Sequence, residues 1–306
     1  MSDSDLETKA GAPAHRAGFV ALVGLPNVGK STLLNTILGR KLAIVTPKPQ
    51  TTRTRILGIE TRPEAQFLFV DTPGLHRPRN LLGERMVRAA EQGLAEADVG
   101  LWLVDAGAGI RAEEEELAGR LAAAGKPILV ALNQIDRVKR PALLPLLDRL
   151  GKLLPGHHVV PVSARTGENL DELLKTVAGA LPESPPLFPA DAQTDLPEKF
   201  FAAEIVREQI LLATEQEVPY QSAVTIESFE EKTEKNLLVI AAQIRVARSS
   251  QKPILLGEKG QRIKEIGRRA RLELESFFGV RVYLELFVKV DSRWFERAGT
   301  LTELGL

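Results

Sequence analysis

The pattern of apolar and polar positions divides the chain into two halves. In the first half, short apolar runs alternate with stretches of helical period; the runs are residues 19–23, 67–70, 99–104, 128–132 and 159–160. Apolar strands that alternate with helices of about ten to fifteen residues predict a mostly parallel sheet with helices on both faces. We therefore expect an α/β domain over residues 17–181.

The second half has a different pattern. Positions 202, 206, 210 and 213 form a helical stripe, residues 224–226 and 238–246 alternate as strands, residues 263–277 form a second helical stripe, and residues 282–290 alternate as a last strand. A glycine loop at residues 257–260 separates the two later helices. The predicted order is α-β-β-α-α-β, a small α+β domain within residues 198–306 that includes a C-terminal extension.

Two segments have no period. Residues 1–16 mix Gly, Ala, Pro and charged residues, and we expect a disordered tail there. Residues 182–197 carry five prolines, which is typical of an extended, semi-rigid linker. A proline-rich recognition peptide is the alternative interpretation of this segment.

Composition narrows the classes of function. Lys and Arg together number 40, as do Asp and Glu, so any basic surface must be local. The absence of Cys excludes disulfides and thiolate chemistry. The four histidines lack metal-ligand spacing; they are His15, His76, His157 and His158. No apolar run approaches the roughly 18 residues of a membrane span, so we expect a cytoplasmic protein, with peripheral membrane contact left open.

A phosphate-binding motif follows the first strand. Residues 24–31 read Gly-Leu-Pro-Asn-Val-Gly-Lys-Ser and match the P-loop pattern G-x-x-x-x-G-K-[ST], with a helical run after them. In such a loop, N–H groups at a helix N-terminus face phosphate oxygens, Lys30 reaches the β- and γ-phosphates, and Ser31 can ligate Mg²⁺. We expect nucleotide contacts from Gly24, Asn27, Val28, Gly29, Lys30, Ser31 and Thr32.

A second motif ends the strand at residues 67–70. Asp71-Thr-Pro-Gly74 places a carboxylate at the carboxyl edge of the sheet, where α/β sheets bind ligands. Asp71 can hold a water of the Mg²⁺ shell, and the Gly74 N–H can meet the γ-phosphate. The spacing from the P-loop favours this role over that of an ordinary turn.

Residues 47–55, between these motifs, form a polar stretch interrupted by prolines. A Thr hydroxyl here could complete Mg²⁺ coordination while a γ-phosphate is present, which would couple the order of the loop to the nucleotide. We favour Thr52 over Thr51. Arg53 and Arg55 could supply positive charge to the reaction, or they could instead face solvent or RNA.

The base is addressed by two further segments. Asn133-Gln134-Ile-Asp136 follows the strand at residues 128–132, and its Asp can accept from N1–H and N2–H₂ of guanine, a pair that adenine lacks. Asn133 can fix the loop and contact the Hoogsteen edge of the base. After the strand at residues 159–160, a triplet would bring a backbone N–H toward guanine O6; it consists of Ser163, Ala164 and Arg165.

These five elements, in this order, resemble the motifs of translation-factor-class GTPases. The resemblance narrows to the Era-like group, because the chain has both Gly-x-Pro-Asn-Val-Gly-Lys-Ser and Gln-Thr-Thr-Arg. Gln134 and Arg165 replace the lysines usual in that family, so we expect guanine preference to be kept with weaker affinity. The resemblance also implies that Asn27 helps hold K⁺ near the phosphates of GTP or GDP.

Leu75 follows Gly74 where Ras-like GTPases have the Gln that orients the attacking water. A leucine side chain cannot hydrogen-bond water, so we expect slow unaided hydrolysis, stimulated by K⁺ over Na⁺. The predicted catalytic residues are Lys30, Thr52, Asp71, Gly74 and Asn27. The neighbouring His76 is an alternative base.

The glycine loop of the second half predicts RNA binding. The loop Gly257-Glu258-Lys259-Gly260 lies between two predicted helices. KH domains use a glycine loop in this position to clamp the backbone of single-stranded nucleotides. Residues 245–271 hold nine Lys or Arg against two Glu, which favours an RNA groove over a merely solvated face. The RNA contacts expected besides the four loop residues are Arg245, Lys252, Arg262, Ile263 and Lys264.

The α-β-β-α-α-β order is similar to a type II KH domain, and its union with such a GTPase resembles the Era-like family over nearly the whole chain. The resemblance implies binding to the 3′ end of 16S rRNA and help in maturation of the 30S ribosomal subunit. We expect a monomer. A small-molecule kinase with a P-loop, and an RNA-binding protein with an inert GTPase half, are the alternatives.

Overall fold

The computed structural model describes residues 15–75, 78 and 80–306. The predicted tail, apart from its last two residues, and His76 lie outside the described residues. The first half is a six-stranded sheet of order β2-β3-β1-β4-β5-β6, in which β2 is antiparallel to β3 and the other pairs are parallel. The strands are β1 (Arg16–Val23), β2 (Ile56–Thr61), β3 (Ala65–Asp71), β4 (Val99–Asp105), β5 (Ile128–Asn133) and β6 (Val159–Pro161).

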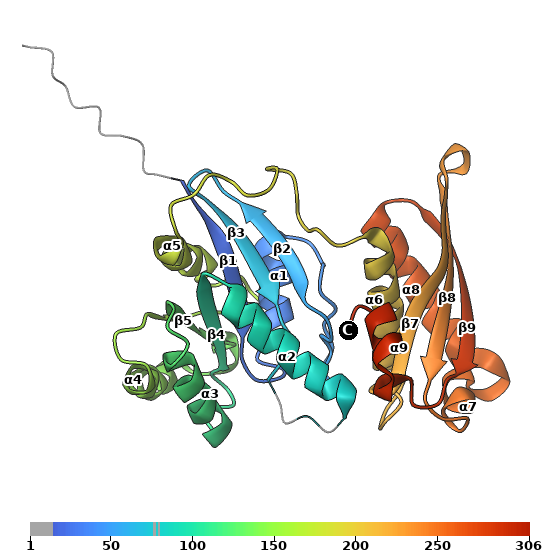
Figure 1. Ribbon diagram of the computed structural model, residues 1–306, viewed down its shortest axis with the longest axis horizontal. Coiled ribbons are helices and arrows are strands. Elements are labelled where there is room, and N and C mark those ends of the chain that lie inside the picture. The colour runs from blue at the N-terminus through green and yellow to red at the C-terminus, as the bar shows by residue number, and fades with distance from the viewer. Residues whose placement is uncertain (1–14, 76–77, 79) are drawn as a thin grey trace, which may run out of the picture.

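Helices cover both faces of this sheet (Figure 1). They are α1 (Lys30–Leu38), α2 (Leu81–Glu96), α3 (Ala112–Ala122), α4 (Leu143–Leu153) and α5 (Leu170–Ala180), with 3₁₀ turns η1 (Ile135–Arg137) and η2 (Arg140–Ala142). One apolar cluster packs α1 and α5 against one face, and a second packs α3 and α4 against the other. The predicted mostly parallel sheet is confirmed. Strand β2, which the sequence pattern did not predict, is added at the edge.

The second half is a three-stranded sheet with two helices on one face. Its elements are α6 (Glu198–Ala213), β7 (Ser222–Lys232), η3 (Thr233–Lys235), β8 (Leu237–Val246), α7 (Gln251–Leu256), η4 (Glu258–Gly260), α8 (Gln261–Phe278), β9 (Arg281–Val290), η5 (Trp294–Glu296) and α9 (Ala298–Glu303). Strand β8 pairs antiparallel with β7 and parallel with β9. Alternate residues of β8 are buried against α6 and α8. The predicted α-β-β-α-α-β order is confirmed.

The segment that joins the halves lies along strand β2. Ile59 N donates to Gln193 O at 2.8 Å. The buried Gln66 side chain accepts from the backbone N–H groups of Leu187 and Phe188 through Oε1. The Ile59 bond pairs part of the free edge of β2, which would otherwise offer unpaired backbone groups, and the Gln66 bonds fix the start of the segment. The segment is therefore extended and held against the first half.

The two halves share an apolar cluster beside α2. Leu82 and Met86 of α2 pack with residues of the second half and its C-terminal extension, namely Ala223, Ala247, Trp294 and Leu301. Figure 1 shows α9 on the side of the second half that faces α2. Helix α2 follows the loop that begins at Asp71, so this cluster joins the second half to the neighbourhood of the nucleotide motifs. In the described residues, no helix has both the length and the apolar character that crossing a membrane requires.

Candidate functional site

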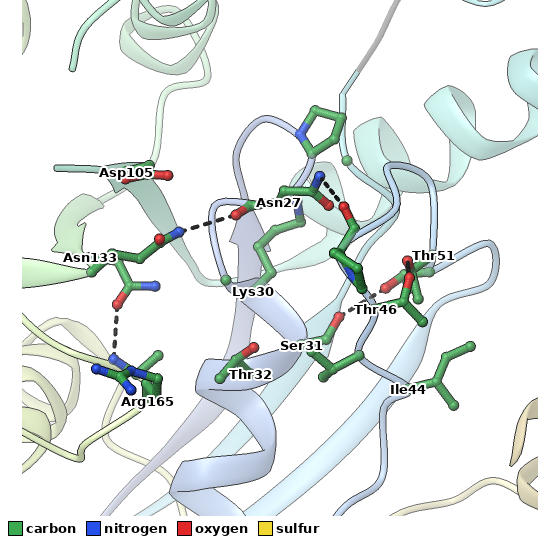
Figure 2. A pocket seen from close by; sticks show the side chains of 18 of the residues that line it. Asn27, Lys30, Ser31, Thr32, Ile44, Thr46, Thr51, Asp105, Asn133 and Arg165 are labelled. Atoms are coloured by element: carbon green, nitrogen blue, oxygen red, sulfur yellow. Dashed lines mark hydrogen bonds between the residues drawn. The ribbon is translucent and has the colours of Figure 1, made fainter. Parts of the chain in front are cut away.

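A cavity of about 880 Å³ opens at the carboxyl edge of the first sheet. Figure 2 shows Lys30 and Ser31 in its middle, with Asn133 and Arg165 on one side and Thr46 and Thr51 on the other. Its lining comprises Pro26, Asn27, Gly29, Lys30, Ser31, Thr32, Ile44, Val45, Thr46, Pro47, Gln50, Thr51, Thr52, Gly74, Asp105, Asn133, Gln134, Asp136, Arg137, Ala164 and Arg165. All five predicted motifs therefore contribute to one cavity.

The P-loop is closely packed around its glycines and Lys30. Gly29 has φ 98°, and a Cβ there would lie 2.4 Å from Asn133 Nδ2, so no side chain fits. The Lys30 ammonium donates to the carbonyl oxygens of Gly24 at 3.1 Å and Leu25 at 3.0 Å. Burial lowers the pKa of Lys30 to about 8, against the opposing effect of the Asp71 and Glu114 carboxylates. The amine is held beside the position that phosphates would take.

Three predicted metal ligands meet at one point. Ser31 Oγ donates to Asp71 Oδ2 at 2.6 Å and lies 2.9 Å from Thr52 Oγ1, and Thr52 Oγ1 donates to Asp71 Oδ2 at 3.3 Å. Asp71 is fully buried, and its Oδ1 has no hydrogen-bond partner in the described part of the chain. Burial raises the pKa of Asp71. A buried, unsatisfied carboxylate oxygen between two hydroxyls fits Mg²⁺, which prefers oxygen ligands.

The structure separates the two candidate threonines. Thr51 Oγ1 lies 2.7 Å from Thr46 Oγ1 and donates to Lys48 O at 2.8 Å, within its own loop. Thr52, by contrast, is buried beside Asp71. The geometry thus favours Thr52, as the sequence did. No group of three or more His, Asp or Glu side chains in the described ranges is arranged to hold a metal.

The base end of the cavity is connected by side-chain bonds. Asn133 Nδ2 donates to Val28 O at 2.8 Å, and its Oδ1 accepts from Ala164 N at 2.9 Å, so this side chain joins the P-loop to the 163–165 segment. Asp136 accepts from Ser163 Oγ at 2.6 Å and from Arg165 Nη2 at 2.6 Å. These donors hold the pKa of Asp136 below its usual range, Ser163 most strongly, so it is a carboxylate at neutral pH.

The two departures from the family pattern have defined positions. Gln134 has φ 63° and its Nε2 donates to Asn27 O at 3.1 Å, so it bridges the base loop and the P-loop. Arg165 is 73% exposed and pairs with Asp136. A guanine that binds Asp136 must share the carboxylate with this guanidinium. Asn27 Nδ2 donates to Pro47 O at 3.1 Å, which ties the P-loop to the following polar loop.

Leu75 packs against the apolar cluster on the α3 face of the sheet. Its N–H donates to Gly24 O at 3.3 Å, so the residue is fixed next to the P-loop, and its side chain has no polar atom to hold water. The side chain therefore contributes packing rather than chemistry. His76 is outside the described residues.

Sequence reasoning missed two acidic groups near the cavity, of which Glu114 is buried and Asp105 is half-buried. Glu114 of α3 is 3% exposed, and burial raises its pKa to about 7. Asp105, at the end of β4, lines the cavity and accepts from Gly107 N at 2.7 Å. Glu114 lay in a run of glutamates that reads as a solvated helix face, so its pattern gave no signal. Asp105 had a weak one, because it ends a strand at the ligand-binding edge.

The expectation for Arg53 was wrong. Its guanidinium is 6% exposed and donates to the carbonyl oxygens of Pro219 at 2.9 Å, Tyr220 at 3.1 Å and Ser222 at 2.7 Å. These carbonyls belong to the second half, so Arg53 faces neither the reaction nor solvent. Arg55 is half-exposed and pairs with Glu96 at 2.8 Å. Sequence spacing could not show that residues more than 160 positions apart meet.

The predicted RNA loop has the backbone of a close approach. Gly257 has φ 71°, and a Cβ there would lie 2.6 Å from Arg262 Cβ. Beside the loop is a cavity of about 540 Å³, lined by Leu212, Ala213, Gly257, Glu258, Gln261, Arg262, Glu265, Ile266 and Arg269. Lys259 is exposed and has φ 48°. The loop and the start of α8 therefore form one side of a groove, and the end of α6 forms the other.

The remaining predicted RNA residues are distributed unevenly. Lys252 and Lys264 are exposed on α7 and α8, and Ile263 is half-buried in the core of the second half. Arg245 lies on β8, pairs with Asp291 at 3.5 Å and does not line the groove. Part of the basic run is paired internally: Arg268 and Arg269 both bind Glu265, and they lower its pKa to about 2.

Comparison with known families agrees with this division into two halves. The sequence model of a family described as 50S ribosome-binding GTPase matches residues 19–134, and that of the KH domain matches residues 217–295. The chain is 47% identical over 290 residues to GTPase Era of Syntrophus aciditrophicus, with 95% of each chain covered. It is 49% identical to GTPase Era of Aquifex aeolicus, with 92% of this chain and 96% of that one covered.

Two solved structures are similar over the whole fold. A single-residue variant of Aquifex aeolicus Era bound to GDP·AlF₄⁻ has a TM-score of 0.91 and 47% identity, and Era in complex with MgGDPNP and nucleotides 1506–1542 of 16S ribosomal RNA has a TM-score of 0.92 and 48% identity. Each alignment covers 95% of this chain and 99% of the other. The five motifs around one cavity, the KH loop and these full-length similarities agree, and the chain belongs to the GTPase Era family.

Proposed function

We propose that this protein is a GTP-hydrolysing switch that binds 16S rRNA near its 3′ end and assists assembly of the small ribosomal subunit. One observation carries the nucleotide part: a single cavity is lined by Asp136 and by Ser31 and Thr52, whose hydroxyls bond to the buried Asp71 carboxylate. Such a cavity suits a nucleoside triphosphate whose metal would lie near Ser31 and Thr52 and whose base would lie near Asp136.

The phosphates would be bound by the P-loop N–H groups and by Lys30. Their negative charge favours the protonated amine, so Lys30 would exchange its bonds to Gly24 O and Leu25 O for phosphate oxygens. At the other end, Asp136 accepts from the guanine N1–H and N2–H₂ groups. Adenine lacks this pair of donors, so the Asp136 carboxylate sets the base preference.

Magnesium suits the point where Ser31, Thr52 and Asp71 meet. The ion, when bound, neutralises charge between the β- and γ-phosphates. The two hydroxyls would bind it directly, and Asp71 would act through a coordinated water. Asp71 Oδ1, which has no partner in the described residues, supplies the acceptor that such a water requires. The Gly74 N–H would meet the γ-phosphate.

Hydrolysis would be slow without help, because the half-buried Leu75 side chain packs against the core and has no polar atom to hold water. Asn27 places a carboxamide between the P-loop and Pro47 O, where a K⁺ ion would add positive charge near the transferred phosphoryl group. We therefore expect turnover to be faster in KCl than in NaCl at equal ionic strength, by about tenfold for one added contact worth roughly 1.4 kcal/mol. Equal rates would remove this part of the proposal.

The RNA part is supported by the second half. Its glycine loop, the groove beside it and the exposed lysines of α7 and α8 fit a single-stranded backbone. The relative solved with nucleotides 1506–1542 of 16S rRNA is similar to this chain over both halves. In the proposed cycle, the GTP-bound protein holds the RNA and hydrolysis resets it.

The description of the family that matches residues 19–134 mentions the 50S subunit, which is the competing partner. That match covers the GTPase half alone. The KH half and the solved complex with 16S rRNA favour the small subunit. The test below distinguishes the two, since 16S and 23S rRNA are sequenced together.

The experiment is recovery of RNA on the full-length protein loaded with a non-hydrolysable GTP analogue. Enrichment of the 3′ end of 16S rRNA supports the proposal, and recovery of mixed RNA or of 23S rRNA contradicts it. In parallel, wild type should turn over GTP many times, and Lys30→Ala should lower turnover by about 10³-fold, the loss expected for a charge contact to the transition state. Turnover that ATP supports equally would favour a small-molecule kinase instead.

Three further parts of the proposal stay predictions from the sequence. They are the cytoplasm as the place of work, a monomeric state and peripheral contact with a membrane. Work on the small ribosomal subunit would take place in the cytoplasm, which supports the first.

A further inference from the structure

We propose that the C-terminal end of α6, residues 207–214, couples the nucleotide cavity to the RNA groove. This inference rests on the proposed function, because it assigns a residue-level route by which GTP and RNA affect each other. One stretch of helix has the nucleotide loop bound to one side and forms a wall of the RNA groove on the other.

The nucleotide loop is residues 39–55, between α1 and β2. Within it, Thr52 reaches the predicted metal site, and both of its sequence neighbours are bound to the second half. Arg207 of α6 donates through Nη2 to Thr51 O at 2.6 Å. Arg53 donates to carbonyls of residues 219–222. Thr52 is therefore held between two contacts made by buried guanidinium groups.

The same loop contacts α6 at three more places. The Lys41 ammonium donates to Glu208 Oε2 at 2.6 Å. Val45 N donates to Glu208 Oε1 at 3.0 Å. The Lys48 ammonium donates to the carbonyl oxygens of Leu211 and Thr214. These are carbonyls of the last helical turn and the C-cap, which have no partner inside the helix. The loop thus completes the end of α6.

The other side of that end is the RNA groove. Leu212 and Ala213, which lie between the two carbonyls bound by Lys48, line the groove opposite Gly257 and Arg262. Leu212 is 47% exposed there. A change in how the 39–55 loop binds residues 211 and 214 must therefore shift or loosen this wall of the groove.

The contact between the loop and α6 is buried but incompletely hydrogen-bonded. Arg207 is 3% exposed and pairs with Glu204, but its Nη1 has no partner in the described part of the chain. The Arg53 guanidinium is also buried, at 6% exposed. A buried guanidinium with an unsatisfied donor makes the docked loop less stable than a fully bonded contact would be, so a bound ligand can change how tightly the loop docks.

Thermodynamic linkage makes the effect reciprocal. If Mg²⁺ and a γ-phosphate hold Thr52, they favour the docked loop and so the docked end of α6. If RNA favours the same arrangement of α6, it must strengthen GTP binding by the same factor. Arg53, Arg207 and Lys48 are positioning residues in this scheme, because they touch neither nucleotide nor RNA.

The test measures the ratio of RNA affinities of the full chain with a Mg²⁺-bound GTP analogue and with Mg²⁺-bound GDP, using a 16S rRNA 3′-terminal fragment. Wild type should bind the RNA on the order of tenfold more tightly with the analogue. Arg207→Gln and Lys48→Met should each bring this ratio close to one. Arg53→Lys keeps the positive charge but cannot make all three hydrogen bonds to the carbonyls of residues 219–222, so its ratio of RNA affinities should be intermediate.

Arg40→Gln is the matched control. Arg40 also bridges the halves, with its guanidinium 4.6 Å from the Phe277 ring, but it does not touch residues 207–214. Its ratio should equal that of wild type. Lys48→Met changes the first half only, so the test does not depend on whether Arg207→Gln folds.

Wild-type ratios in Lys48→Met and in folded Arg207→Gln would overturn the inference while leaving the proposed function intact. Failure of wild type to turn over GTP or to bind the fragment would instead sink the proposed function. Amide exchange at residues 51–53 adds a readout that a merely structural role would not move. The analogue should slow it in wild type and not in Arg207→Gln.

Discussion

The two candidate sites are built by different means. The nucleotide cavity depends on side chains that bond to one another: Asn133 joins two loops, and Ser31, Thr52 and Asp71 share hydrogen bonds. The RNA groove depends on backbone shape at Gly257 and on exposed cations. A site of the first kind can recognise one base, and a site of the second kind can hold a nucleic-acid backbone of many sequences.

This difference explains where the sequence was informative. A P-loop fixes which atoms meet phosphate, so the P-loop and Asp136 could be assigned to one site before the fold was known. The structure places both at one cavity, with Asp71 buried beside Ser31. The groove needed the end of α6 as its second wall, and nothing in Leu212 or Ala213 indicates that role. Arg245, predicted from the charge of its neighbourhood, lies away from the groove, because strand alternation turns it to the other face.

The largest expected effect on binding affinity tests whether one side chain determines the choice of base. Asp136→Asn should lower GTP affinity about 100-fold, because two hydrogen bonds to a charged acceptor are lost or reversed, each worth roughly 1.5 kcal/mol. Affinity for xanthosine triphosphate, whose base has a carbonyl in place of the amine, should rise. Competition against a fluorescent guanine nucleotide measures both.

Asp98→Asn is its control, since Asp98 lies at the opposite edge of the same sheet and accepts from Phe19 N. It should leave both affinities unchanged. Unaltered GTP binding in Asp136→Asn would mean that the base is read elsewhere.

A pH titration sharpens the phosphate end. The pKa of Lys30 is about 8 in the protein without nucleotide, and phosphates favour its charged form. GTP affinity should therefore fall as pH rises above 8, by up to about tenfold per pH unit. Calorimetry should show proton uptake on binding in that range. Binding that is level from pH 7 to pH 9.5 would show that Lys30 is charged throughout.

The lowered pKa of Lys30 affects folding stability in the opposite direction from GTP affinity. Between pH 8 and 10.5 the unfolded chain keeps a proton at Lys30 that the folded chain has lost, so this group makes the free energy of unfolding rise with pH. Because the Lys30 shift stabilises the folded protein as pH rises, a loss of GTP affinity between pH 8 and 10.5 cannot be attributed to unfolding caused by this group. Thermal unfolding without nucleotide at each pH provides the check.

Gly257→Ala tests the backbone site. The new Cβ would meet Arg262 Cβ at 2.6 Å, so the loop must move, and RNA affinity should fall about tenfold for strain of roughly 1–3 kcal/mol. GTP turnover without RNA should not change. Gly279→Ala is the matched control, because its φ is 70° but nothing lies within 4 Å of its Cβ. Equal RNA affinities in the two variants would show that the shape of the loop is unimportant.

The smallest expected effect concerns Arg165. Its pair with Asp136 is 73% exposed on the arginine side, and exposed pairs contribute less than about 1 kcal/mol. Arg165→Ala should therefore change GTP affinity less than about fivefold, upward if the guanidinium competes with guanine and downward if it packs on the base. Equilibrium binding at two salt concentrations measures this, and a change beyond tenfold would contradict the view of Arg165 as a weak neighbour.

What the sequence could not supply is mostly contact between distant segments. Arg53 stands in a polar loop that looks solvated, and it is buried only because residues 219–222 lie against it. Nothing in the sequence around Arg207 distinguishes it from other helical arginines, although its side chain donates to Thr51 O in the structure. Strand β2 follows that loop without strong alternation, and pairing with β3 determines it. The local sequence pattern predicts motifs and helices well, but it contains no information about which distant surfaces contact each other.

The central claim is that one nucleotide cavity governs one RNA groove. The most direct measurement is the affinity of the wild-type chain for a 16S rRNA 3′-terminal fragment, compared between a Mg²⁺-bound GTP analogue and Mg²⁺-bound GDP. The account predicts tighter binding with the analogue, on the order of tenfold, and no such effect of an ATP analogue. Equal RNA affinity in the two guanine-nucleotide states would contradict it.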